Sequence, residues 1–294
     1  MTALQTIIAL TRAETRKLTD RALLWTEAGI FALLVAGLHL ALMATLAAPQ
    51  QKGLPPEALE ALKASLRWPQ GFLSGLAFAG GSGLGGLFAV VLAAALSGQE
   101  YTWRTVHLWL SRGVGRGAYL LGKAIVLAAA LVVLAFTAFA AGAAATGIYT
   151  LQGGGSLPWH ALPWGKAAAG IGAAALGLAP YAALTVLVAV LTRSTLAAVG
   201  VGLGYNLLVE NMAAKVLLLA SPHTMRFARY LPAMAGQSLL KGIAPGTEVS
   251  IGVSGASGVA ALLSPATAAL LLAAYTLAGL ALAWWAFRRQ DITA

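Results

Sequence analysis

Residues Leu96–Lys123, LSGQEYTWRTVHLWLSRGVGRGAYLLGK, form a polar and basic interruption between two long apolar runs. The stretch contains four basic residues and one acid, Glu100. A helix over Tyr101–Ser111 would have an apolar face formed by Trp103, Val106 and Leu110. Its polar face would contain Arg104, His107 and Ser111. Such a helix lies along a membrane surface, so we predict a partner-docking helix; a basic loop that only fixes topology is the alternative.

The overall composition is that of a membrane protein. Of the 294 residues, 59% are hydrophobic and only 10% are charged, which is too apolar for a soluble domain. A membrane-spanning helix needs about 20 mostly apolar residues. Six runs meet this requirement, at about 24–48, 71–96, 118–149, 165–191, 195–219 and 265–287. The absence of cysteine excludes disulfides, thiol catalysis and thiolate metal sites.

The pattern therefore predicts an all-α integral membrane protein with a single domain over residues 1–294. An amphipathic interfacial helix occupies residues 1–22, and a six-helix membrane domain follows over 24–287. The longest connection, 221–263, is placed on the outer side. An even number of spans puts both termini on one side, and the distribution of basic residues predicts that this side is cytoplasmic. The net charge of +10 then reflects topology and anionic lipid headgroups instead of nucleic acid.

Three catalytic patterns were considered and set aside. Gly117–Lys123 fits seven positions of a phosphate-binding loop, but Ala124 lacks the hydroxyl that magnesium requires, and the segment opens a membrane helix. Two G-x-S-G sequences, at 80–83 and 255–258, resemble those of intramembrane serine proteases, but no histidine lies in a later span to act as base. The four histidines are scattered, so we expect no metal site. We expect a protein without an enzymatic site of its own.

Polar residues inside the spans are candidates for a substrate path. These candidates are His39, Tyr205, Asn206 and Glu210. Hydrogen bonding between helices is the alternative for Tyr205 and Asn206, and simple packing is the alternative for His39. We expect Glu210 and Lys215 to lie near the outer interface, where their side chains can reach water.

The stretch and its flanks resemble the permease subunits of type-2 ABC transporters, the exporter class. The matching positions are Glu100, Thr105, Leu108, Leu110, Arg116 and Lys123, whereas Gly113 stands where proline is common. The amphipathic first helix, Leu231-Pro232 and the ending Phe287–Asp291 extend the resemblance over essentially the whole chain. The individual motifs are weak, and their order and spacing support the resemblance.

The resemblance implies two cytoplasmic ATPase subunits and a second permease subunit, identical or different, in the inner (cytoplasmic) membrane. ATP and magnesium would bind the ATPase, and this chain would bind no cofactor. A coupling helix at about 99–112 would contact the ATPase. The coupling residues would be Glu100, Tyr101, Trp103, Arg104, Thr105, His107, Leu108, Arg112 and Arg116.

Two other classes of function remain open from the sequence. An ion-coupled secondary transporter would need ionisable residues deep in the spans, of which few are found. A non-conducting membrane anchor for a soluble partner would share the docking helix and need no path through the membrane.

Overall fold

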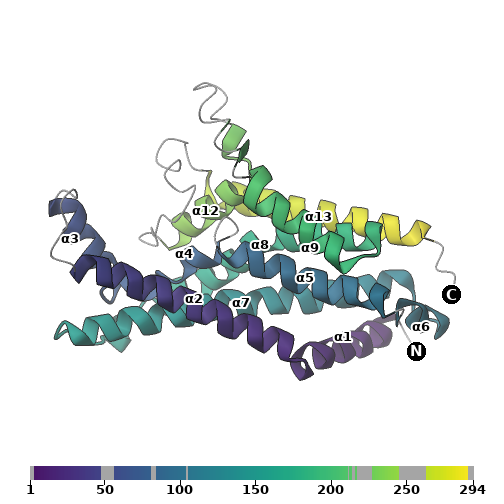
Figure 1. Cartoon of the computed structure of the whole chain (residues 1–294), viewed down its shortest axis with the longest axis horizontal. Coiled ribbons are helices and arrows are strands. Elements are labelled where there is room, and N and C mark those ends of the chain that lie inside the picture. The colour runs from purple at the N-terminus through teal and green to yellow at the C-terminus, as the bar shows by residue number, and fades with distance from the viewer. Residues whose placement is uncertain are drawn as a thin grey trace.

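The computed structural model describes residues 3–47, 56–80, 84–103, 105–210, 212–213, 216, 227–244 and 263–290, and all regular structure in them is helical. Five of the described helices are long and apolar enough to cross a membrane. They are α2 (Ala22–Ala47), α5 (Leu84–Thr102), α7 (Arg116–Gln152), α8 (Trp164–Thr192) and α13 (Pro265–Arg289). Together they form an elongated helical bundle (Figure 1). The chain is therefore a multi-pass membrane protein.

Helix α8 lies at the centre of the bundle. It packs against α5, α7 and α13, while α2 packs mainly against α7. Alanine and glycine dominate α8, and such small residues let neighbouring backbones approach closely on several sides. The helix continues through Pro180. By contrast, α2 and α13 leave much of their apolar surface uncovered, as expected for helices that face lipid or another subunit.

The second predicted span, 71–96, is wrong as a single helix. A 3-10 helix, η1 (Gln70–Leu73), and a short helix, α4 (Leu76–Ala79), come first, and α5 begins only at Leu84. The backbone leaves the helical region at Gly80, with ψ at 153°. The segment before it is pressed against α7: a Cβ on Gly75 would lie 2.1 Å from the carbonyl oxygen of Ala138. Only glycine permits that approach.

The predicted span at 195–219 is described only in its first part. Helix α9 (Thr195–Gly204) continues into a π-helix, η3 (Tyr205–Val209). Most positions beyond Glu210, including Lys215, lie outside the described residues. The turn before α9 is tight: Arg193 adopts a left-handed conformation with φ of 54°, and the Ser194 hydroxyl accepts a hydrogen bond from the backbone N–H of Ala197. A sixth span therefore remains a prediction.

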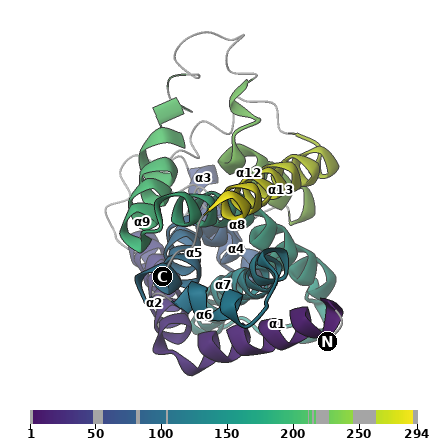
Figure 2. The same cartoon turned by 90° about the vertical axis from the view of Figure 1, so that its right-hand side faces the viewer.

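One end of the bundle gathers α1 (Ala3–Asp20), the short helix α6 (Thr105–Ser111) and the carboxyl end of α13 (Figure 1). Figure 2 shows α1 lying lengthwise across this end. Helix α3 (Pro56–Ser65) lies at the opposite end, and α12 (Pro232–Ile243) packs on α8 and α13.

Because α7 has 37 residues, it is about 55 Å long and extends beyond the roughly 30 Å hydrocarbon core of a bilayer.

The predicted docking helix is also divided. Tyr101 still belongs to the last turn of α5, Trp103 lies in a turn, and α6 begins at Thr105. Trp103 is consequently exposed, whereas Val106 is buried, so the two do not share the apolar face that the sequence predicted. Gly113 follows α6 with φ of +80°, which a proline could not adopt. Glycine therefore suits this turn, whereas proline would not fit it.

Candidate functional site

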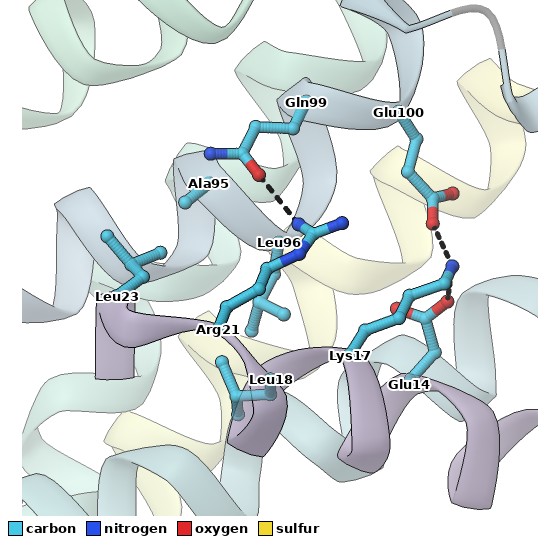
Figure 3. A pocket seen from close by; sticks show the side chains of 9 residues that line it. All are labelled: Glu14, Lys17, Leu18, Arg21, Leu23, Ala95, Leu96, Gln99 and Glu100. Atoms are coloured by element: carbon cyan, nitrogen blue, oxygen red, sulfur yellow. Dashed lines mark hydrogen bonds and ion pairs between the residues drawn. The ribbon is translucent and has the colours of Figure 1, made fainter. Parts of the chain in front are cut away.

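Four charged side chains meet where α1, α5 and α7 converge: Glu14, Lys17, Glu100 and Lys123. We call this group the cytoplasmic cluster, after the side of the membrane on which the distribution of basic residues predicts this end of the bundle. The Nζ atom of Lys123 lies 3.1 Å from Glu14 Oε2 and 3.2 Å from Glu100 Oε1. Lys17 Nζ lies 2.7 Å from Glu14 Oε1 and 2.8 Å from Glu100 Oε1. Figure 3 shows the contacts of Lys17 with both carboxylates. Two positive and two negative charges balance.

The position of Glu14 follows from the spacing of the buried side chains along α1. Leu10, Glu14 and Leu18 recur every four residues and all three are buried. The acid therefore occupies the face of α1 that packs on α7, instead of the water-facing side. Glu14 was not among the site residues predicted from the sequence, yet its place between two leucines on one face was a usable signal.

Hydrogen bonds extend the cytoplasmic cluster. The Tyr119 hydroxyl donates to Glu100 Oε2, and Lys123 Nζ donates to the carbonyl oxygen of Leu96 over 2.8 Å. Beside the cluster, Arg21 Nη1 donates to Gln99 Oε1 over 2.8 Å (Figure 3). The buried ends of α5 and α7 are thereby tied to α1. Such a fully paired network fixes the relative positions of its helices.

Lys17 is the member of the cluster closest to solvent, with a side chain 31% exposed. Burial disfavours its charge, but hydrogen bonds to Glu100 and Glu14 outweigh that effect. The pKa of Lys17 is therefore raised above its ordinary value. The ammonium group also lies 4.9 Å from the centre of the Trp109 ring in α6, a cation–π contact. Lys17 thus links the cluster to α6.

Helix α6 offers a mixed surface to the water. Val106 is its buried anchor, and the exposed residues include His107, Leu108 and Ser111. An open hollow of about 470 Å³ lies beside it. The hollow is lined by His107, Leu110, Ser111, Gly113, Val114, Gly115 and Arg116. An apolar side chain next to basic ones at an open hollow is a surface that can dock another protein.

The predicted coupling residues fall into distinct groups. Exposed are Trp103, His107, Leu108 and Arg112, and half-buried are Tyr101 and Thr105. Glu100 is buried and therefore does not offer its carboxylate to a partner. Arg116 Nη1 donates to the carbonyl oxygens of Phe287 and Arg288, which ties α7 to the end of α13. Arg104 lies outside the described residues.

The candidates for a substrate path do not form one group. Asn206 and Glu210 are buried and Tyr205 is half-buried, all in or directly after η3. His39 belongs to α2 and contacts Val35 O and Ser74 Oγ, each at 2.8 Å. Both of its ring nitrogens therefore have hydrogen-bond partners.

The expectation that the Glu210 side chain reaches water is wrong. Its carboxylate is buried, accepts a hydrogen bond from the Tyr181 hydroxyl, and accepts another from the backbone N–H of Ala233 over 2.5 Å. Ala233 is the second residue of α12, so Glu210 satisfies one of the free amides at a helix start. The acid is held inside the protein by two partners because they replace water as its hydrogen-bond donors.

The described residues contain no group of three or more histidine, aspartate or glutamate side chains arranged to hold a metal ion. The acids of the cytoplasmic cluster are instead neutralised by lysine. At this end of the bundle the exposed surface and hollow of α6 therefore lie next to a buried group of paired charges.

The five long apolar helices are those of a multi-pass membrane protein. A comparison with protein families matched residues 8–292 to the family described as ABC-2 family transporter protein. The chain therefore belongs to the ABC-2 transporter family and forms its membrane component. Members of this family typically lack an ATPase domain, and membership implies an ATPase partner. A comparison with curated proteins found no match.

Proposed function

We propose that this chain is the permease subunit of an ATP-driven exporter in the inner membrane, energised by a separate cytoplasmic ATPase subunit. α6, with the turn that precedes it, serves as the coupling helix, and α1 serves as the interfacial elbow. The observation that carries this proposal is the exposed surface of α6 above the cytoplasmic cluster. Its exposed side chains can meet a partner, while α6 itself packs on α5 and contacts Lys17 of α1 through Trp109.

The cytoplasmic cluster gives the coupling helix a mechanical connection to the membrane domain. Glu100 lies in the last turn of α5, and α6 follows after a short turn. Its carboxylate binds Lys123 of α7 and Lys17 of α1. A movement of α6 caused by ATP binding would therefore displace α5, α7 and α1 together. Glu100 acts here as a positioning residue and not as a contact to the ATPase.

The remaining parts of the transporter are assigned by the same proposal. Two ATPase subunits and a second permease subunit complete the assembly, and substrate passes between the two permeases. In this proposal α9 and η3 begin a sixth span, so that both termini lie on the same side of the membrane, the cytoplasmic side. The distribution of basic residues supports this orientation. Arg112 follows α6 directly, Arg116 binds the end of α13, where Arg288 and Arg289 lie, and Arg193 interacts with Tyr101 of α5.

Co-purification from native membranes tests the proposal. We expect a nucleotide-hydrolysing subunit to accompany the wild-type chain in mild detergent. The variant His107→Ala/Leu108→Ala, which changes only exposed residues of α6, should lose that subunit while the permease keeps its folded yield. Trp159→Ala, an exposed aromatic outside α6, is the matched control and should retain the partner. The absence of any such subunit from the wild-type preparation would overturn the proposal.

A further inference from the structure

A buried acid in the first membrane helix takes no part in the contacts described above. Glu27 is 6% exposed, and neither of its carboxylate oxygens has a hydrogen-bond partner within the part of the chain that the structure describes. It lies five residues after the start of α2, about 7.5 Å into the helix. Among the described residues, no ion pair includes it. An ionised carboxylate in such a place is unfavourable because nothing replaces its hydration.

The face of α2 that carries Glu27 is packed inside the protein. Leu24, Phe31 and Val35 share this face and are buried, and the Phe31 ring lies 4.8 Å from that of Phe88 in α5. The other side of α2 is exposed and apolar, with Trp25 and Leu33 among its residues. Glu27 therefore points toward α5 and α7, away from lipid. A leucine would complete this face without an unpaired acid.

The charged groups on the neighbouring elements are already engaged. α2 packs against α1, α5 and α7. Their buried or half-buried titratable residues near this end are Glu14, Lys17, Arg21, Glu100, Tyr101, Arg116, Tyr119 and Lys123. Each bonds another residue: the cytoplasmic cluster with Tyr119, Arg21 with Gln99, Tyr101 with Gln290, and Arg116 with the carbonyl oxygens of Phe287 and Arg288. None of these bonds involves Glu27, so no residue that the structure describes balances its charge in an ion pair.

We propose that Glu27 is an intramembrane proton-binding site, which holds a proton while α2 is packed against α5 and α7 and releases it when that packing opens. The neutral carboxylic acid suits the apolar surroundings of the packed helix. Separation of α2 would admit water and allow ionisation. Proton binding and the position of α2 are then linked, so acidic conditions favour the packed arrangement. The proposal does not depend on an ATPase partner.

An apolar carbodiimide tests the protonated state in membranes that contain the full-length chain. Dicyclohexylcarbodiimide reacts with protonated carboxylic acids in apolar surroundings, and mass spectrometry locates the modified residue. We expect modification of Glu27 that falls at least tenfold between pH 6 and pH 9. Glu60, an exposed acid paired with Lys63, is the control and should stay unmodified. Lack of modification at Glu27 throughout this range would overturn the proposal.

An introduced cysteine tests whether protonation of Glu27 is linked to the packing of α2. The chain has no cysteine of its own, so the introduced thiol is unique. Val35→Cys places a thiol on the same buried face, two turns beyond Glu27. Its maleimide labelling should rise more steeply with pH when Glu27 is present than in Glu27→Gln, whose side chain cannot ionise. The titration of the thiol itself is common to both proteins, so it cancels when their labelling rates are divided by one another at each pH. Equal pH profiles would refute the link, whatever partner the permease has.

Discussion

Removal of Lys123 is the sharpest test of the cytoplasmic cluster as a structural element. The side chain is 5% exposed, and its ammonium group contacts Glu14, Glu100 and the carbonyl oxygen of Leu96. Lys123→Met keeps the apolar stem but leaves two buried carboxylates with Lys17 alone. Loss of one partner from a buried ionic group costs about 3–5 kcal/mol. We therefore expect this loss in the free energy of unfolding, measured by denaturation in mixed micelles.

Two further variants make the result specific. Lys63→Met also removes a paired lysine, but Glu60 is 72% exposed, so the expected cost is only about 0–1 kcal/mol. Lys123→Met/Glu14→Gln removes one charge of each sign and should regain about half of the lost stability, because one neutral pair of Lys17 and Glu100 remains. A cost for Lys123→Met no larger than that for Lys63→Met would refute the reasoning.

Three more outcomes are expected from the same structure. Gly75→Ala should cost about 1–3 kcal/mol of folding free energy, because its Cβ would overlap α7. Gly37→Ala, whose Cβ would have nothing within 4 Å, should be nearly neutral. Unfolding measurements on both variants test this difference. Glu210→Ala should cost about 1–3 kcal/mol by leaving the Ala233 amide unpaired, and unchanged protease resistance of α12 would contradict this. Because the pKa of Lys17 is raised in the folded protein, its charge contributes fully to stability below pH 10.5. This contribution is lost as the pH rises through the higher folded-state pKa. In unfolding measurements at increasing pH, Lys17→Arg should move this loss of stability to higher pH.

The sequence contained enough information for the membrane class and for most helix positions. Apolar runs of sufficient length specify spans directly, because each must satisfy its own backbone hydrogen bonds in lipid. The turn at Arg193 was equally clear, because this basic residue lies in the short gap between the apolar runs 165–191 and 195–219. So short a connection between two spans must be a tight turn. The family resemblance also came from residues in order, Glu100 and Lys123 among them, and the family match confirms it.

The interruptions of helices were not predictable from composition. The break near Gly80 depends on the contact of Gly75 with α7, which is remote in sequence. The division between α5 and α6 depends on how the end of α5 is held by Lys17 and Lys123. Hydrophobic periodicity describes one helix at a time, so it does not report such contacts.

Acidic residues were the hardest to place. Glu210 was expected to reach water, because ionisable groups near the ends of spans usually do. It is instead buried, since Tyr181 and Ala233 donate to it. Glu14 and Glu27 went unnoticed among hydrophobic neighbours, although both lie on the buried face of their helix. Partners from other helices decide these positions, and they become visible only when the helices are assembled.

Cross-linking from α6 is the measurement that tests the central claim most directly. The chain has no cysteine, so Leu108→Cys creates a unique thiol on the exposed surface of α6, and Trp164→Cys creates one on an exposed position outside it. With a short bifunctional reagent in native membranes, the account predicts a cross-link from residue 108 to a nucleotide-hydrolysing subunit and none from residue 164. A cross-link from neither site, in membranes where the permease is folded and its thiols react, would contradict the assignment of α6 as the coupling helix.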